Sequence, residues 1–114
     1  MSIPMADETG VILTNIEEIP GRRVTRHHGL VCGSLVRSKH AGSDLLAGIQ
    51  NVFGGELGGY TKLLDETREE ATKRMITQAK SLGANAVLNV RFSTSSVAQG
   101  AAEIYVYGTA VTVE

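Results

Sequence analysis

Tryptophan is absent from this sequence, and aromatic residues make up only 4% of its 114 positions. Flat cofactors are commonly held between aromatic rings, so the shortage of aromatic side chains argues against a site that stacks one. We expect a core built mainly from Val, Leu, Ile and Ala instead.

Cysteine is nearly absent as well. Cys32 stands alone, which excludes a disulfide within the chain. The first ten residues lack the basic stretch followed by an apolar one that marks a secretory signal, and no run approaches the roughly 18 apolar residues that a membrane span needs. We therefore expect a cytoplasmic protein without a membrane span.

An excess of positive charge is also missing, because the formal net charge is -1. Without that excess the chain cannot neutralise a row of phosphates, so nucleic acid is not expected as a partner. Hydrophobic residues at 42% and charged residues at 20% are typical of a folded globular chain. The length fits one domain, which we assign to residues 11–114, with residues 1–10 as a flexible N-terminal arm.

The apolar pattern predicts four strands. They cover residues 11–14, 23–36, 86–92 and 104–113, and a turn rich in Ser, Thr, Gly and Ala is expected over residues 93–101. The second strand exceeds the usual length, so Gly29 and Gly33 are expected to bend or bulge it.

Two helices are predicted between the second and third strands. A short amphipathic helix is expected over residues 45–53, and a long one from about Tyr60 to Leu82 that ends at Gly83. The long helix carries charged pairs at i, i+4 on its outer side and a buried apolar stripe, which comprises Leu64, Ala71, Met75, Ala79 and Leu82.

The last strand is apolar on both faces. Ile104, Val106 and Ala110 alternate with a second apolar set, which comprises Tyr105, Tyr107, Val111 and Val113. Helices cover only one face of the sheet in a two-layer domain, so the second set needs another cover. A second copy of the chain would supply it, because burying apolar area stabilises by about 25 cal/mol per Å². The sequence thus predicts a homo-oligomer with this second set at the interface.

Four stretches together resemble the YbjQ-like (UPF0145) family. They are VFGGELGGY at residues 52–60, LDETREEA at 64–71, AKSLGANAV at 79–87 and YGTAV at 107–111. The resemblance implies an α+β fold with two layers, in which an antiparallel sheet carries helices on one face around a β-α-β-β core similar to the dodecin subunit. It also implies a ring-shaped homopentamer, a heavy-metal-binding description and no established enzymatic activity.

A metal site within one chain is disfavoured by spacing. His27, His28 and Cys32 are the candidate ligands, and His40 is the remaining imidazole. His27 and His28 point to opposite faces of a strand, and Cys32 lies about 13 Å along it from His28, whereas ligands of one zinc lie within about 4 Å of each other. A transition metal is the one cofactor suggested, and its binding would therefore need a bulge in the strand or ligands from several subunits.

The glycine-rich loop is assigned a structural role. It comprises Gly54, Gly55, Glu56, Gly58, Gly59 and Tyr60. It lacks the Lys-Ser/Thr of a Walker loop and follows a helix rather than a strand, so packing between helices or subunits fits better, with an anion at the start of the Tyr60 helix as the alternative.

The acidic residues of the long helix are expected on its solvent-exposed face. No Ser-His-Asp or Cys-His catalytic group can be assigned from the sequence. We expect a non-enzymatic, ring-forming binding or structural module; the alternatives are a metal-binding assembly and a small-molecule carrier.

Overall fold

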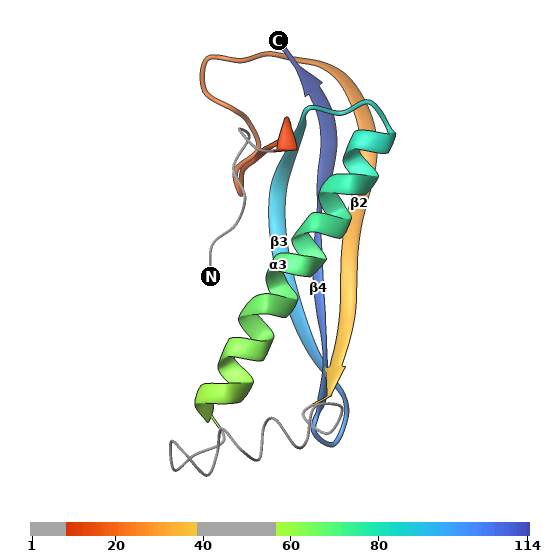
Figure 1. The fold of residues 1–114 in the computed structure, drawn as a ribbon. Helices are drawn as coiled ribbons and strands as arrows, with labels where there is room; N and C mark the ends of the chain where they lie inside the picture. The colour runs from red at the N-terminus through yellow and green to blue at the C-terminus, as the bar shows by residue number, and fades with distance from the viewer. Residues whose placement is uncertain (1–8, 39–56) are drawn as a thin grey trace.

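The computed structural model describes residues 9–38 and 57–114, and its elements follow the labels of Figure 1. In chain order they are β1 (Ile12–Leu13), β2 (Val24–Ser38), α3 (Leu57–Ser81), β3 (Ala86–Ala98) and β4 (Ala101–Val113). One sheet has the order β1-β3-β4-β2. The helix expected over residues 45–53 lies outside the described residues.

The fold has two layers, and α3 lies along one face of the sheet (Figure 1). This confirms the expected α+β arrangement. The three long strands are antiparallel, while short β1 pairs in parallel with β3, so the sheet is mixed rather than wholly antiparallel. The extents of 53 × 25 × 21 Å and the radius of gyration of 16.5 Å describe an elongated molecule, since a compact chain of this length would have a radius of gyration of about 13 Å.

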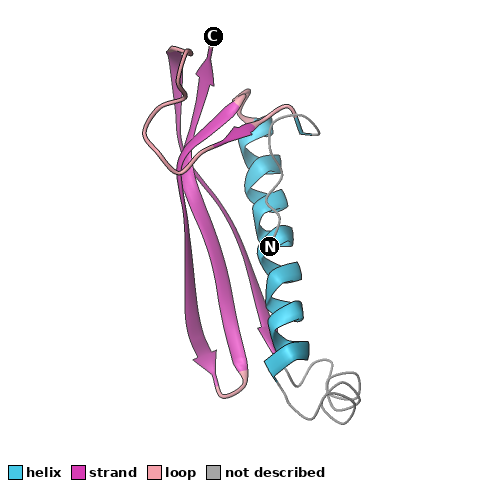
Figure 2. Cartoon of the chain, turned by 90° about the vertical axis from the view of Figure 1, so that its left-hand side faces the viewer, coloured by secondary structure: helices cyan, strands magenta, loops and turns pink. Residues whose placement is uncertain are grey.

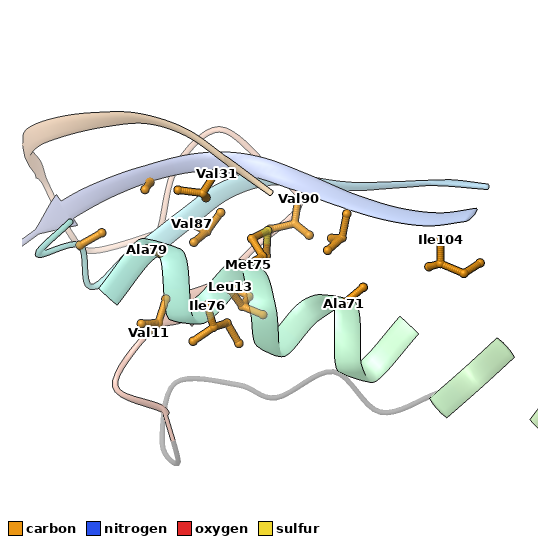
Figure 3. Close-up of a cluster of buried hydrophobic side chains, with 13 residues drawn as sticks. Val11, Leu13, Val31, Ala71, Met75, Ile76, Ala79, Val87, Val90 and Ile104 are labelled. Carbon is orange, nitrogen blue, oxygen red and sulfur yellow. The ribbon is translucent and has the colours of Figure 1, made fainter. Parts of the chain in front are cut away.

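The main core lies between α3 and the sheet (Figure 3). Ala71, Met75 and Ala79 are fully buried on the sheet side of the helix, as their spacing predicts. The strands add apolar side chains to the same layer, among them Val31, Val87, Val90, Ile104 and Val106. Leu82 is 45% exposed, contrary to prediction, because the helix ends at Ser81 and Gly83 follows with a φ of 86°.

Two glycines let the layers approach closely. A Cβ on Gly33 would lie 2.0 Å from the Ala71 carbonyl oxygen, and one on Gly108 would lie 2.5 Å from a Val87 methyl group. The sequence suggested a bend or bulge at Gly33, but the register with β4 is not shifted there. Instead, Gly33 lets β2 lie close against the helix backbone. Gly29 does mark a bulge, since its φ is 102° and the register shifts between His27 and Gly29.

A second apolar cluster lies on the opposite face of the sheet. It contains Ala86, Leu88, Val111 and Val113 with Ile12 and Ile19 packed against it. In Figure 2 the connection between β1 and β2 crosses this face at the end near the C-terminus. Its backbone is tied to β3, because the Thr14 and Ile16 carbonyls accept hydrogen bonds from the Val90 and Asn89 N–H groups at 2.9 and 3.0 Å.

Strand β3 contains a bulge that the alternation of apolar residues did not reveal. Asn89 has a φ of 54°, and the register with β4 shifts between Leu88 and Arg91. Consequently Val87 and Val90 both join the core beneath α3, although simple alternation would place them on opposite faces. Residues 93–98, expected in a turn, continue β3, and the hairpin turns at Gln99 and Gly100.

Within residues 9–38 and 57–114 there is no helix long and apolar enough to cross a lipid bilayer.

Candidate functional site: the open surface of the sheet

The face of the sheet opposite α3 is covered at one end only. Beyond the β1–β2 connection, paired strands present exposed or half-buried side chains, which we call the open surface: Leu30, Cys32, Ser34, Val36, Arg91, Ser93, Glu103, Tyr105 and Tyr107. Leu30 is 79% exposed, Val36 54% and Tyr107 38%. Figure 2 shows that no described element lies over this part of the strands.

The strand register places the open surface in rows. Tyr107 lies between Cys32 on β2 and Arg91 on β3, and Tyr105 lies between Ser34 and Ser93. The rings of Tyr105 and Tyr107 have centroids 5.5 Å apart and are tilted by 34°, a separation at which aromatic pairs attract each other. The centre of the surface is therefore an aromatic pair.

Cys32 is a free, half-buried thiol beside that pair. A hydrogen bond with Cys32 is the main reason that the pKa of Tyr105 lies above its ordinary value of 10.0, and the charges of Cys32, Tyr107 and Glu103 act in the same direction.

Part of the expected interface is already covered within the chain. Tyr105 and Tyr107 belong to the open surface, as their place on β4 suggested. Val111 and Val113, by contrast, are each only 2% exposed and belong to the cluster packed against Ile12 and Ile19. The apolar pattern of β4 could not show this, because Ile12 of β1 and Ile19 of the β1–β2 connection lie far from β4 in the sequence.

The candidate metal ligands lie in three different surroundings. His27 is exposed on the outer strand, and His28 is half-buried with its Nε2 2.8 Å from the Thr112 hydroxyl. Cys32 lies on the open surface. No three His, Cys, Asp or Glu side chains gather in a metal-binding arrangement within the described part of the chain, and His40 lies outside it. A single copy thus provides no metal centre from His27, His28 and Cys32.

The glycine-rich loop lies only partly within the described residues. Gly54, Gly55 and Glu56 fall outside them. Helix α3 begins at Leu57, so Gly58, Gly59 and Tyr60 form part of its first turns rather than preceding it. Gly59 is buried and Tyr60 is half-buried.

The charged side chains of α3 act locally. Arg68 forms an ion pair with Asp65 one turn before it, and Arg74 donates a hydrogen bond to the Ser34 carbonyl of β2 at 3.1 Å. Arg91 of β3 donates a hydrogen bond to the Asn15 carbonyl at 2.6 Å.

Sequence reasoning missed Leu30 and Val36 as parts of the surface. The alternation along β2 could have identified them. Val31 and Gly33 face the helix, and the alternate residues face away from it: Leu30, Cys32, Ser34 and Val36.

Comparison with known proteins agrees with the resemblance found in the sequence. A protein named UPF0145 in Hahella chejuensis is 64% identical over 104 residues, which cover 91% of this chain and all of that protein. A UPF0145 protein of Thermus thermophilus is 56% identical over 91% of each chain. A crystal structure from Pediococcus pentosaceus, of unknown function and assigned to the DUF74 family, shares the fold at 15% identity, with a TM-score of 0.64 over 92% of this chain and 99% of that one. The family model YbjQ_1, described as "Putative heavy-metal-binding", matches residues 11–114, and the chain therefore belongs to this family of UPF0145 proteins.

Proposed function

We propose that this protein is a non-enzymatic binding or structural module that assembles into a homo-oligomeric ring through its open surface. The observation that carries the proposal is the exposure of Leu30, Val36 and Tyr107 on one continuous part of the sheet. Large apolar side chains that gather on one surface favour a protein partner.

The exposed apolar side chains of the open surface support a contact between copies, because burying apolar area stabilises by about 25 cal/mol per Å². A stable interface buries about 800 Å² on each partner. A ring requires the open surface of one copy to contact a different surface of the next copy, because a contact between identical surfaces closes as a dimer. The family resemblance favours five subunits.

The test is native mass spectrometry of the full chain, with elemental analysis of the same sample. Wild type should appear as one discrete oligomer of about five subunits. Leu30→Asp should dissociate it by placing a charge in the contact. Leu82→Asp is the matched control, since Leu82 is also an exposed leucine, at 45%, but lies beyond the end of α3. A monomeric wild type, or equal effects of both variants, would contradict the proposal.

The second candidate is a heavy-metal-binding assembly whose ligands come from several subunits. The family description supports it, and Cys32 lies on the surface that copies would share. Zinc or copper should then bind to the oligomer with a defined stoichiometry, and the double variant His27→Ala/His28→Ala or Cys32→Ala should bind less. Equal, weak binding by all three proteins would end this candidate, whereas the ring proposal would still stand.

A further inference from the structure

The outer edge of β2 is protected by two side chains of the helix. Strand β2 is last in the sheet order, so its outer side has no strand neighbour among residues 9–38 and 57–114. Such an edge presents free N–H and C=O groups to which a strand of another chain can add. In this protein the Cys32 N–H donates to Oε1 of Gln78 at 2.7 Å, and the Ser34 carbonyl accepts from Nη1 of Arg74 at 3.1 Å.

The close approach of α3 makes these two contacts possible. Arg74 and Gln78 are four residues apart, so they lie above one another on the side of α3 next to the β2 edge. Between them Met75 is fully buried against the sheet. Gly33, whose missing Cβ would strike the helix backbone, lies between the two β2 residues that are capped. The glycine therefore brings the helix near enough for both side chains to reach over the edge.

The N-terminal part of this edge is irregular. The register of β2 with β4 shifts between Val24 and Arg26 and again between His27 and Gly29. Bulges twist an edge and interrupt the even spacing of its hydrogen-bonding groups, which hinders strand addition. The edge is therefore bulged between Val24 and Gly29 and capped at Cys32 and Ser34.

We propose that Arg74 and Gln78 act as an edge guard, which prevents a strand of a second copy from adding to β2 and so leaves the open surface for assembly. The guard does not depend on the number of subunits in the assembly. Its removal would free a regular stretch of edge around Cys32 and Ser34. Assembly would then continue through backbone pairing into larger species without a fixed size.

The experiment compares three full-length proteins by light scattering over a range of concentrations and by thioflavin T fluorescence. The variant Arg74→Ala/Gln78→Ala should reach at least twice the mass of wild type, increasing with concentration. The control Lys73→Ala/Thr77→Ala changes two exposed residues one position earlier on the same helix and should keep the wild-type mass. Equal masses for all three proteins, or growth of the control as well, would overturn the inference.

A second-site substitution on β2 tests whether the larger species form by pairing through the edge of this strand. Residues two apart on a strand direct their backbone groups to the same side, so the Ser34 N–H points outward like the Cys32 N–H. Proline is tolerated at such a position, because the N–H that it lacks is not used within the sheet. Adding Ser34→Pro to the double variant should abolish the increase of its mass with concentration. Persistent growth would show that the larger species do not pair through β2.

Two further measurements keep this test separate from the ring proposal and from folding. Amide hydrogen exchange at Cys32 should accelerate at least tenfold in Gln78→Ala, which removes only the acceptor of that N–H, and an unchanged rate would count against the guard. Circular dichroism should show wild-type melting for both double variants. A monomeric wild type would end the ring proposal, yet growth of the Arg74→Ala/Gln78→Ala variant from that monomer would still support the guard.

Discussion

The two faces of the sheet differ in how much of their apolar surface the chain itself covers. The face beneath α3 is closed along the helix, and Ile104, Val106 and Ala110 of β4 are fully buried there. On the opposite face the β1–β2 connection covers Val111 and Val113 but leaves Tyr105 and Tyr107 half-buried or exposed. The same strand is thus fully enclosed on one face and only half enclosed on the other. The alternation of apolar residues shows that both faces of the sheet must be covered. It does not show which part is covered by other residues of the same chain and which part is left for a partner.

The largest expected difference between the faces is in folding stability. Ile104→Ala should lower the free energy of unfolding by about 2–5 kcal/mol, because it leaves a cavity beneath α3. Tyr107→Ala, three residues later on the open face, should cost less while weakening self-association. Urea denaturation of both variants at a fixed protein concentration measures the difference. Equal losses would mean that the open face is as tightly packed as the other.

Gly33 tests how closely the covered face is packed. Gly33→Ala should cost about 1–3 kcal/mol, because the new methyl group meets the Ala71 carbonyl oxygen and the helix must move away. Ser34→Ala, the next residue and on the other face, should change stability by less than about 0.5 kcal/mol. Thermal unfolding followed by circular dichroism gives both values. A tolerated alanine at position 33 would contradict the close contact between β2 and α3.

The sequence predicted the elements well wherever one regular period ran through a segment. Ala71, Met75 and Ala79 follow the helical period, and the two faces of β4 follow strict alternation, so both were placed correctly. The prediction failed where a local irregularity changes the period. Asn89 inserts a bulge into β3, and the Ser- and Thr-rich residues 93–98 form a strand because β4 pairs with them, although their composition is typical of a turn.

The candidate site was predicted only in part, for a similar reason. Tyr105 and Tyr107 were identified from the alternation of β4, but the burial of Val111 depends on Ile12 of β1 and Ile19 of the β1–β2 connection, which are distant in the sequence. The contacts of Arg74 and Gln78 with β2 depend equally on how the helix is positioned over the sheet. Spacing along the sequence carries no information on such contacts.

Asn89 lies at the bulge of β3, which changes the face to which the following side chains point. Asn89→Ala should cost about 1–2 kcal/mol, because the left-handed conformation is strained for alanine, whereas the short polar side chain of asparagine can offset the strain by local hydrogen bonds. Asn89→Gly should be close to neutral, since glycine adopts this conformation without strain. Chemical denaturation of the two variants distinguishes a backbone requirement from a side-chain one. If glycine were as destabilising as alanine, the role of Asn89 would lie in its amide group.

The smallest expected effect is in the titration of Tyr105 on the open surface. Replacing Tyr60 and Tyr107 with Phe leaves Tyr105 as the only tyrosine, and its ionisation can be followed by ultraviolet absorbance. The pKa should lie above 10.0, and Cys32→Ala in the same background should lower it toward 10.0, because the hydrogen bond with Cys32 is the main cause of the shift. Since the folded chain holds this proton more tightly than the unfolded chain, the stability that it contributes is complete below pH 10 and is lost as the pH rises through the folded pKa. Identical midpoints in the two proteins would show that Cys32 and Tyr105 do not interact on this face.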